Sequence, residues 1–239
     1  MKNLSETMKK MRLPHCAAVI VAGGSSERFG SDKLFAEIAG TPVLGMTIEA
    51  MARSQCIQEI VLVVREAILD RAARLARAYG GGKVRLVVPG GQTRVLSAYA
   101  GVMSVSKRAR LIAIHDGARP LVSKKVIEDA VWAAYRHLAA APAIAVRDTI
   151  KIAYDGVVTE TPERSTLFAV QTPQVFQADI IRAALVNAAQ KQLSVTDDCA
   201  AAEAIGTPIT LTPGSEENIK ITTPLDLDMA NLIAARRKT

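Results

Sequence analysis

The chain has 239 residues, of which 49% are hydrophobic and 4% are aromatic, and its formal net charge is +7. This length suffices for one sizeable α/β domain with a complete core, and no apolar run approaches the roughly 20 residues of a membrane helix, which excludes a membrane partner. The positive charge favours anionic partners, but no basic run is interleaved with aromatic residues, so we expect nucleotides or acidic metabolites and no nucleic acid.

Short β-branched runs alternate with long Ala-rich helical stretches after a basic N-terminal tail at residues 1–15. This alternation is typical of βαβ units around a parallel sheet. It predicts a single Rossmann-like α/β domain over residues 16–239, with a mainly parallel sheet. The predicted strands are residues 17–22, 59–64, 84–88, 111–114, 143–145 and 209–212.

Two Thr-Pro pairs predict the starts of helices. Thr41–Pro42 and Thr223–Pro224 each combine an N-cap residue with proline at the first helical position, and the helices should run to about Arg53 and Arg237. Three glycines, Gly80–Gly82, predict the end of another helix.

Residues 146–170 interrupt this alternation. They are rich in β-branched residues and contain the turn signal Tyr154-Asp155-Gly156, which predicts a β-hairpin arm protruding from the α/β body. Because an isolated hairpin is marginally stable in water, the arm should pack on another surface. That surface is either the arm of a second subunit or the arm's own domain, and these residues alone leave both open.

The loop after the first strand, VAGGSSERFGSDK at residues 21–33, lies where open α/β sheets bind ligands. It matches neither the Walker A nor the dinucleotide-binding pattern. Gly23 and Gly24 allow close backbone approach and positive φ angles, and we expect backbone N–H groups here that cradle an anion, with phosphate contacts from Arg28 and Lys33.

Two further strand ends repeat this arrangement. Gly90–Gly91 follow the third strand and lead to Arg94 and Ser97 at a helix N-terminus, and Asp116 and Arg119 follow the fourth strand. In a parallel sheet these three ends share one edge, where Asp116 could hold Mg²⁺ directly or through water. The sequence thus predicts a basic, glycine-lined phosphate site.

The sequence lacks the familiar nucleophilic devices. There is no GxSxG motif and no cysteine flanked by histidine, and His115 fits a structural position better than a catalytic one. Cys16, Cys56 and Cys199 lack zinc-site spacing and predict buried thiols in a cytoplasmic protein. Attack of a phosphate monoester on a nucleotide α-phosphorus needs no enzyme base, because the monoester's second pKa is about 6.

Seven segments in this order resemble the 2-C-methyl-D-erythritol 4-phosphate cytidylyltransferases of the non-mevalonate isoprenoid pathway: VAGGSSERFGSDK, PGGQTRVLS, HDGARP, VRDTIK, ERSTLFAVQTPQ, TDD and NIKITTPLDL. The resemblance covers nearly the whole chain after the tail. It implies transfer of CMP from CTP to the phosphate of methylerythritol phosphate, with Mg²⁺ as cofactor and pyrophosphate as second product.

The resemblance also implies roles for individual residues. Arg28 and Lys33 correspond to the cations that stabilise the transition state, and Arg164 and Lys220 would position the acceptor, with Thr149 and Arg119 beside them. The implied nucleotide-binding residues are Ala22, Gly23, Gly24, Gly91, Arg94, Ser97, Asp116 and Thr172, of which Asp116 also lies near the metal.

The family's homodimer exchanges an arm that matches residues 146–170, which would carry Thr149 and Arg164 into the neighbouring subunit's site. Two alternatives stay open at this point. One is a ribitol-5-phosphate cytidylyltransferase, which also transfers CMP to a polyol phosphate. The other is a non-catalytic nucleotide- or nucleic-acid-binding module that uses the same basic rim.

Overall fold

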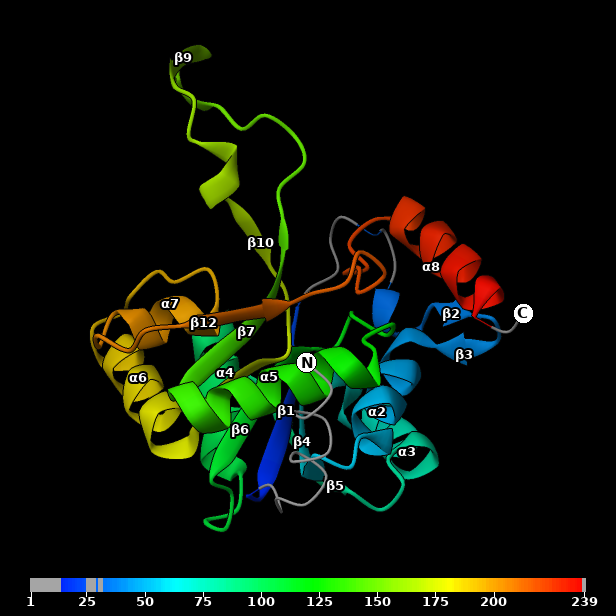
Figure 1. Ribbon diagram of the computed structural model, residues 1–239. Coiled ribbons are helices and arrows are strands. Elements are labelled where there is room, and N and C mark those ends of the chain that lie inside the picture. The colour runs from blue at the N-terminus through cyan, green and yellow to red at the C-terminus, as the bar shows by residue number, and fades with distance from the viewer. Residues whose placement is uncertain (1–13, 25–28, 30–31, 238–239) are drawn as a thin grey trace, which may run out of the picture.

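A mixed eight-stranded sheet forms the centre of the protein (Figure 1). The computed structural model describes residues 14–24, 29 and 32–237. The strands of the sheet are β1 (Cys16–Ala22), β4 (Ile57–Val64), β5 (Val84–Pro89), β6 (Leu111–Asp116), β7 (Ala139–Ala145), β10 (Phe168–Val170), β11 (Gln174–Gln177) and β12 (Thr210–Pro213). Their order is β10-β7-β11-β6-β1-β4-β5, and β12 pairs with β7.

The strands β6, β1, β4 and β5 are parallel neighbours, as the sequence predicted. Strand β11 was not predicted, and it runs antiparallel between β6 and β7. Its four residues begin and end with glutamine, which makes the strand too short and too polar to stand out by composition. The sheet is therefore parallel on one side of β6 and mixed on the other.

Helices cover both faces of this sheet. They are α2 (Val43–Arg53), α3 (Leu69–Tyr79), α4 (Arg94–Ser104), α5 (Lys124–His137), α6 (Ala178–Gln190), α7 (Asp198–Glu203) and α8 (Pro224–Arg236). Successive residues of β1 point to opposite faces: Ile20 packs with residues of α2 and α5, whereas Val19 packs with residues of α4 and α6. Burial on both faces explains why the parallel strands are continuous apolar runs.

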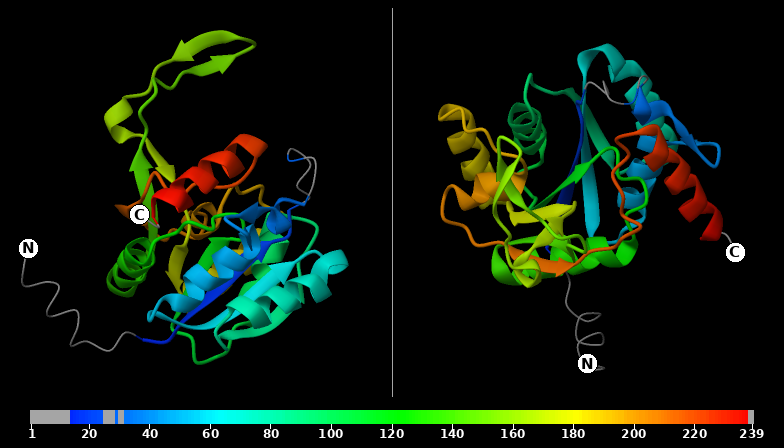
Figure 2. Two further views of the ribbon diagram at one scale, coloured as in Figure 1. Left: turned by 90° about the vertical axis from the view of Figure 1, so that its right-hand side faces the viewer. Right: turned by 90° about the horizontal axis from the view of Figure 1, so that it is seen from above.

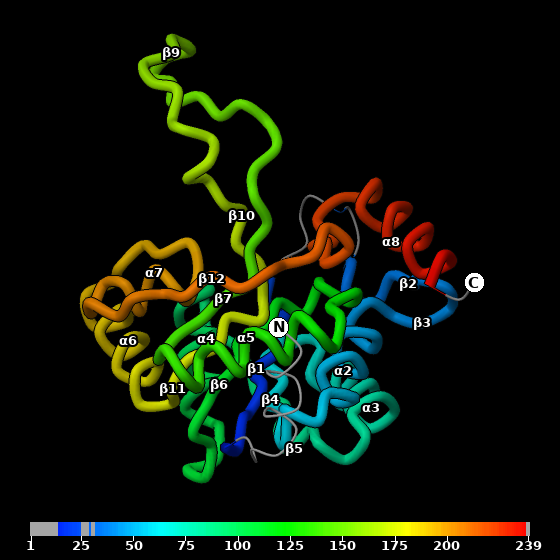
Figure 3. The backbone as a smooth tube through the Cα atoms, in the orientation of Figure 1, coloured from blue at the N-terminus to red at the C-terminus, as the bar shows by residue number. Residues whose placement is uncertain are grey.

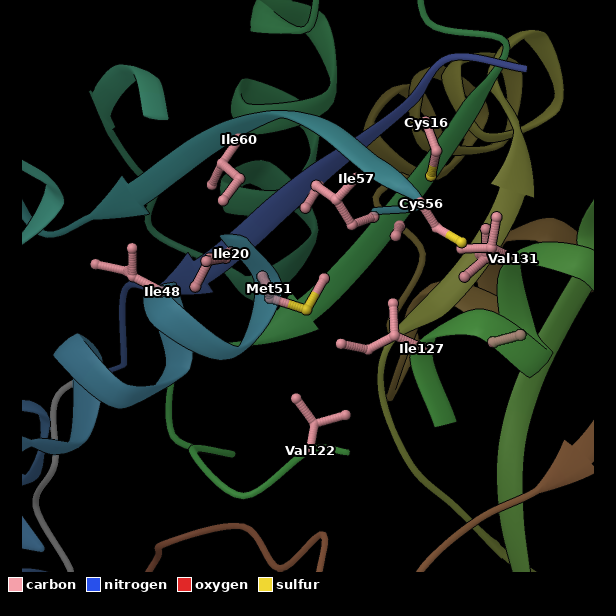
Figure 4. Close-up of a cluster of buried hydrophobic side chains, with 14 of the residues drawn as sticks. Cys16, Ile20, Ile48, Met51, Cys56, Ile57, Ile60, Val122, Ile127 and Val131 are labelled. Carbon is pink, nitrogen blue, oxygen red and sulfur yellow. The ribbon is translucent and has the colours of Figure 1, made fainter. Parts of the chain in front are cut away.

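Figure 4 shows the core on the α2 and α5 side, where Cys16 and Cys56 lie near Ile57 and Val131 and Met51 lies near Ile127. Cys16 and Cys56, like Cys199 on the other face, are buried free thiols, as predicted. Burial raises the pKa of Cys56 to about 11. These side chains therefore act as small apolar residues of the core.

The two predicted helix starts had different outcomes. Thr223 caps α8, because its hydroxyl accepts from the Asp226 N–H and the Asp226 carboxylate accepts from the Thr223 N–H. The prediction at Thr41–Pro42 was wrong: these residues form the short strand β3, paired with β2 (Glu37–Ile38), and α2 begins at Val43 without a side-chain cap. A Thr-Pro pair is compatible with a strand edge as well as with a helix start, and here the pairing with β2 selects the strand.

The chain ends by returning to its N-terminal half. Helix α8 packs on the β2–β3 hairpin and on the segment after β6, through Ile38, Leu121 and Ile233 (Figure 3). The loop at residues 214–223, which leads into α8, is thereby held next to the end of β6. As predicted, glycines follow α3, and Gly81 and Gly82 have φ angles of 54° and 75°.

Residues 146–170 contain the predicted arm, which projects far from the sheet (Figures 1 and 2). It carries β8 (Ile152–Tyr154) and β9 (Val157–Glu160), joined by a turn at Asp155 and Gly156 with φ angles of 49° and 79°. Its last three residues form β10, which returns to the central sheet beside β7. Within the described ranges, no helix is long and apolar enough to span a membrane.

Candidate active site

A cavity of about 790 Å³ lies at the carboxyl ends of the parallel strands. The strand register aligns these ends, because Ala22 lies opposite Val64 and Val21 lies opposite Asp116. The lining residues come from all three predicted strand ends and from the loop before α8: Val21, Ala22, Gly23, Gly24, Lys33, Leu34, Gly91, Gln92, Thr93, Arg94, Ser97, Asp116, Gly117, Ala118, Lys220 and Thr222. Nine of the residues predicted for the site are among them.

Lys33 reaches this cavity from a short 3-10 helix, η2 (Lys33–Phe35), that is anchored on both sides. Asp32 caps η2 by accepting from the Leu34 N–H, and Asp32 Oδ2 lies 2.6 Å from Arg65 Nη2. The Leu34 side chain is buried. These contacts place the backbone of Lys33 at the mouth of the cavity. Arg28, the second predicted transition-state cation, lies outside the described residues.

Close backbone approach, and not positive φ, explains the glycines of the cavity. Of the two properties predicted for Gly23, close backbone approach is confirmed, whereas a positive φ is not found. A Cβ atom at Gly23 would lie 3.2 Å from the Ser97 hydroxyl, and one at Gly90 would lie 2.7 Å from the same oxygen. The Ser97 hydroxyl donates to the carbonyl groups of Gly91 or Thr93. Ser97 therefore joins the first and third strand ends, which only glycines allow at this separation.

Arg94 enters the cavity from the first turn of α4, whose N-cap is Thr93. Its Nη2 lies 2.6 Å from Oδ2 of Asp198, an acid whose side chain is completely buried. Burial raises the pKa of Asp198, although the positive charge of Arg94 opposes the shift. Gln174 Oε1 accepts from the N–H groups of Asp198 and Cys199 and thereby holds the start of α7. No role was predicted for Asp198, because its partner Arg94 lies 104 positions away in the sequence.

Asp116 is the negative centre of the cavity. Its Oδ2 lies 3.1 Å from Lys220 Nζ and 3.3 Å from Arg119 Nε. Burial opposes ionisation of Asp116, but the positive charges of Lys220 and Arg119 outweigh it and lower the pKa to about 2. Asp116 is therefore an anion at neutral pH. No group of three or more His, Cys, Asp or Glu side chains gathers as a metal site in the described part of the chain.

Two predicted site residues, Arg119 and Thr172, lie outside the cavity lining, next to the structural histidine His115. Arg119 pairs with Asp116 and donates from Nη1 to the carbonyl oxygen of Asn218 at 2.6 Å. Thr172 is buried, with its hydroxyl 3.0 Å from the Asp116 nitrogen. His115 is also buried, and burial lowers its pKa to about 4, as expected for a structural, neutral histidine.

Two further predicted residues, Thr149 and Arg164, lie on the arm and do not line the cavity of their own chain. Both side chains are exposed. Arg164 begins the short helix η4 (Arg164–Thr166), and its Nη1 donates to the carbonyl oxygen of Arg147 at 3.2 Å. The fold of one chain thus separates the predicted acceptor residues on the arm from Lys220 in the cavity.

Comparisons with known proteins agree with this architecture. The sequence profile of the family described as 2-C-methyl-D-erythritol 4-phosphate cytidylyltransferase matches residues 16–236. The chain is 42% identical over 226 residues to the protein of that name from Desulforamulus reducens, covering 92% of this chain and 96% of the relative. It is 38% identical over 242 residues to the one from Alkaliphilus oremlandii, covering 100% and 99%.

Solved structures show the same fold. The chain is similar to the 4-diphosphocytidyl-2C-methyl-D-erythritol synthase of Anaerococcus prevotii, with a TM-score of 0.83, 30% identity and coverage of 93% of this chain and 96% of that one. The 2-C-methyl-D-erythritol 4-phosphate cytidylyltransferase of Thermus thermophilus gives a TM-score of 0.76 at 28% identity, covering 92% and 98%. The chain belongs to the 2-C-methyl-D-erythritol 4-phosphate cytidylyltransferase family and is a nucleotidyltransferase.

Proposed function

We propose that the cavity at the ends of β1, β5 and β6 transfers CMP from CTP to 2-C-methyl-D-erythritol 4-phosphate, and that the residues lining it do so by positioning and charge neutralisation alone. One observation carries the proposal: Lys33, Arg94 and Lys220 converge on a single cavity that also contains the ionised Asp116. Such a site suits a reaction in which two polyanions must meet.

In the reaction, an oxygen of the acceptor phosphate attacks the α-phosphorus of CTP. The new P–O bond forms as the bond between the α-phosphorus and the bridging oxygen breaks, and pyrophosphate leaves with the electron pair. The acceptor phosphate is already largely dianionic at neutral pH, since its second pKa is about 6. No side chain therefore has to remove a proton, which fits a cavity whose adjacent histidine is buried and neutral.

We assign the triphosphate to the first loop and the start of α4. The N-terminus of α4 favours an anion, and Arg94 Nη1 is a buried donor without a hydrogen-bond partner among the described residues, so it retains capacity for a phosphate oxygen. Ala22, Gly23, Gly24, Gly91 and Ser97 would contact the nucleoside. Lys33, with Arg28 from the same loop, would neutralise charge as the α-phosphorus becomes five-coordinate.

We assign the acceptor phosphate to Lys220, whose ammonium group lies 3.1 Å from Asp116. Asp116 is the residue that would hold Mg²⁺, since an ionised carboxylate together with substrate phosphates is the usual environment of this ion. When bound, Mg²⁺ would draw negative charge from the phosphates. Without the metal, the ion pairs of Asp116 with Lys220 and with Arg119 keep its carboxylate ionised and directed towards the cavity.

We also propose a homodimer in which each arm completes the partner's site. The arm exposes large apolar side chains, among them Tyr154 at 71% and Val157 at 67% of full exposure, which favours a protein partner. Arg164 and Thr149 on that arm would contact the acceptor bound by the partner subunit, with Arg119 acting from the same chain as Lys220. The buried free thiols further support a reducing, cytoplasmic location.

The test is pyrophosphate release from CTP and Mg²⁺ with either 2-C-methyl-D-erythritol 4-phosphate or ribitol 5-phosphate as acceptor. We expect rapid turnover with the first and at least about a hundredfold lower kcat/KM with the second, because a positioned acceptor must match the site. Preference for ribitol 5-phosphate would reassign the acceptor. Tight CTP binding without turnover would favour a nucleotide-binding module.

A further inference from the structure

Four buried polar side chains lie directly behind the cavity and join three segments that are distant in sequence. His115 is the penultimate residue of β6, Gln171 and Thr172 precede β11, and Asn218 lies in the loop that carries Lys220. None of the four is more than 5% exposed. Among the polar atoms of these side chains, Asn218 Oδ1 lacks a hydrogen-bond partner within the described residues, and the others are paired. Because unpaired buried polar groups are costly, these hydrogen bonds restrict the three segments to one arrangement.

The hydrogen bonds around His115 have only one possible proton arrangement. The carbonyl oxygen of Arg119 can only accept, so His115 Nε2, 3.1 Å away, must carry a proton and donate to it. Because the buried ring is neutral, His115 Nδ1 is then an acceptor, and the Thr172 hydroxyl donates to it at 2.9 Å. Thr172 Oγ1 also accepts from the Asp116 N–H at 3.0 Å. This chain of bonds fixes both ends of the 116–119 turn and therefore the carboxylate of Asp116.

Asn218 connects that turn to the loop of Lys220. Its Nδ2 donates to the Thr172 carbonyl oxygen at 2.9 Å and to Gln171 Oε1 at 3.1 Å. The backbone carbonyl oxygen of Asn218 accepts from Arg119 Nη1 at 2.6 Å. Two residues later, Lys220 pairs with Asp116. The Asp116 carboxylate and the Lys220 ammonium group thus belong to segments that one continuous hydrogen-bonded network holds together, and their ion pair closes this network.

We propose that His115, Thr172 and Asn218 are positioning residues for cytidylyl transfer, which set the separation between Asp116 on the nucleotide side and Lys220 on the acceptor side. The inference rests on the proposed function of the cavity, and it gives Thr172 a role through Asp116 in place of a direct nucleotide contact. Small displacements of groups that align two reacting phosphates cost rate far more than they cost affinity.

The first test compares Thr172→Val with Thr172→Ser. Valine preserves the volume but leaves the Asp116 N–H without an acceptor and His115 Nδ1 without a donor, whereas serine keeps the hydroxyl. We expect Thr172→Val to lower kcat by about 10- to 100-fold with a change in the KM for CTP of less than about threefold, and Thr172→Ser to retain most of the rate.

The second test is a double-mutant cycle between Asn218→Ala and Lys220→Ala. If Asn218 acts by positioning Lys220, the double variant should lose little more kcat than Lys220→Ala alone, whereas independent roles would give multiplied losses. Ile181 belongs to α6 and faces the core. The Ile181→Val variant serves as a control, because it should lower the free energy of unfolding at a site outside the network and leave kcat unchanged.

These outcomes separate the inference from the proposed function. Parental kcat in Thr172→Val, or multiplied losses in the cycle, would overturn the positioning role while leaving the cavity's activity intact. Absence of turnover in the parent protein itself would instead overturn the proposed function. All variants are compared at a temperature below their unfolding midpoints, measured by circular dichroism, so that a merely structural role would leave kcat unaffected.

Discussion

The cavity and the arm both present cationic and hydroxyl side chains, but they hold them in different ways. In the cavity, the side chains of Asp116 and Arg94 are 13% and 28% exposed, and each has a charged partner within 3.5 Å. On the arm, Thr149 and Arg164 are exposed on a segment whose β8–β9 hairpin pairs only with itself. One chain therefore organises the nucleotide side of the site by itself, whereas the side chains of the arm need a second surface to hold them in place.

The largest loss of activity should follow the removal of Lys33, one of the three cations that line the cavity among the described residues. Lys33→Ala should lower kcat by about 10²- to 10³-fold, because the ammonium group is expected to act as charge develops in the transition state. Folding should be unaffected, since Asp32 and Leu34 anchor the segment. Lys125→Ala, on the exposed side of α5, is the matched control and should behave as the parent protein. Equal kcat in Lys33→Ala and the parent protein would remove Lys33 from this role.

Mixed dimers test the arm directly. Lys33→Ala and Arg164→Ala chains should each be nearly inactive alone. If the arms exchange, co-expressed chains form heterodimers with one intact site, so that random mixing restores about a quarter of the parental activity in a pyrophosphate-release assay. Activity that stays at the level of the separate variants would mean that Arg164 serves its own chain or none.

Lowering the pH tests the ion pairs of the cavity through Asp116, whose pKa falls from 3.8 to about 2 on folding. Because the folded pKa is the lower one, its contribution of about 2 kcal/mol is complete above about pH 5 and is lost as the pH falls through 3.8 and then through about 2. The free energy of urea unfolding, measured at pH 5 and pH 2.5, should therefore fall less in Asp116→Asn than in the parent protein. The same fall in both proteins would show that the network does not stabilise the ionised form.

A modest change in dimer affinity is expected from a substitution at the apolar tip of the arm. Tyr154→Ser removes a side chain that is 71% exposed in the single chain, so it should leave the unfolding midpoint of the monomer unchanged. It should weaken the proposed dimer by about tenfold in dissociation constant, as expected for a lost aromatic contact at an interface. Sedimentation equilibrium at several concentrations measures this, and unchanged association would place the dimer contact elsewhere.

Much of the cavity could be predicted because its signals are local. A strand that ends in glycines, followed by a lysine or arginine, identifies a phosphate-binding loop within a few residues, and this sufficed for Lys33, Arg94 and Asp116. Neither the Arg94–Asp198 ion pair nor the hydrogen bonds between His115 and Thr172 could be found this way. Asp198 lies 104 positions from Arg94, and Thr172 lies 57 positions from His115, so no spacing pattern connects them.

The α/β class, the parallel strands and the ligand-binding edge could be read from the chain, because hydrophobic periodicity and glycine turns act over short stretches of residues. Three features required the folded arrangement: β11 runs antiparallel beside β6, Gly23 approaches Ser97 closely, and Asn218 links the loop of Lys220 to Thr172. These features depend on pairs of groups that meet through burial, and partners for buried polar groups are selected by the folded arrangement as a whole.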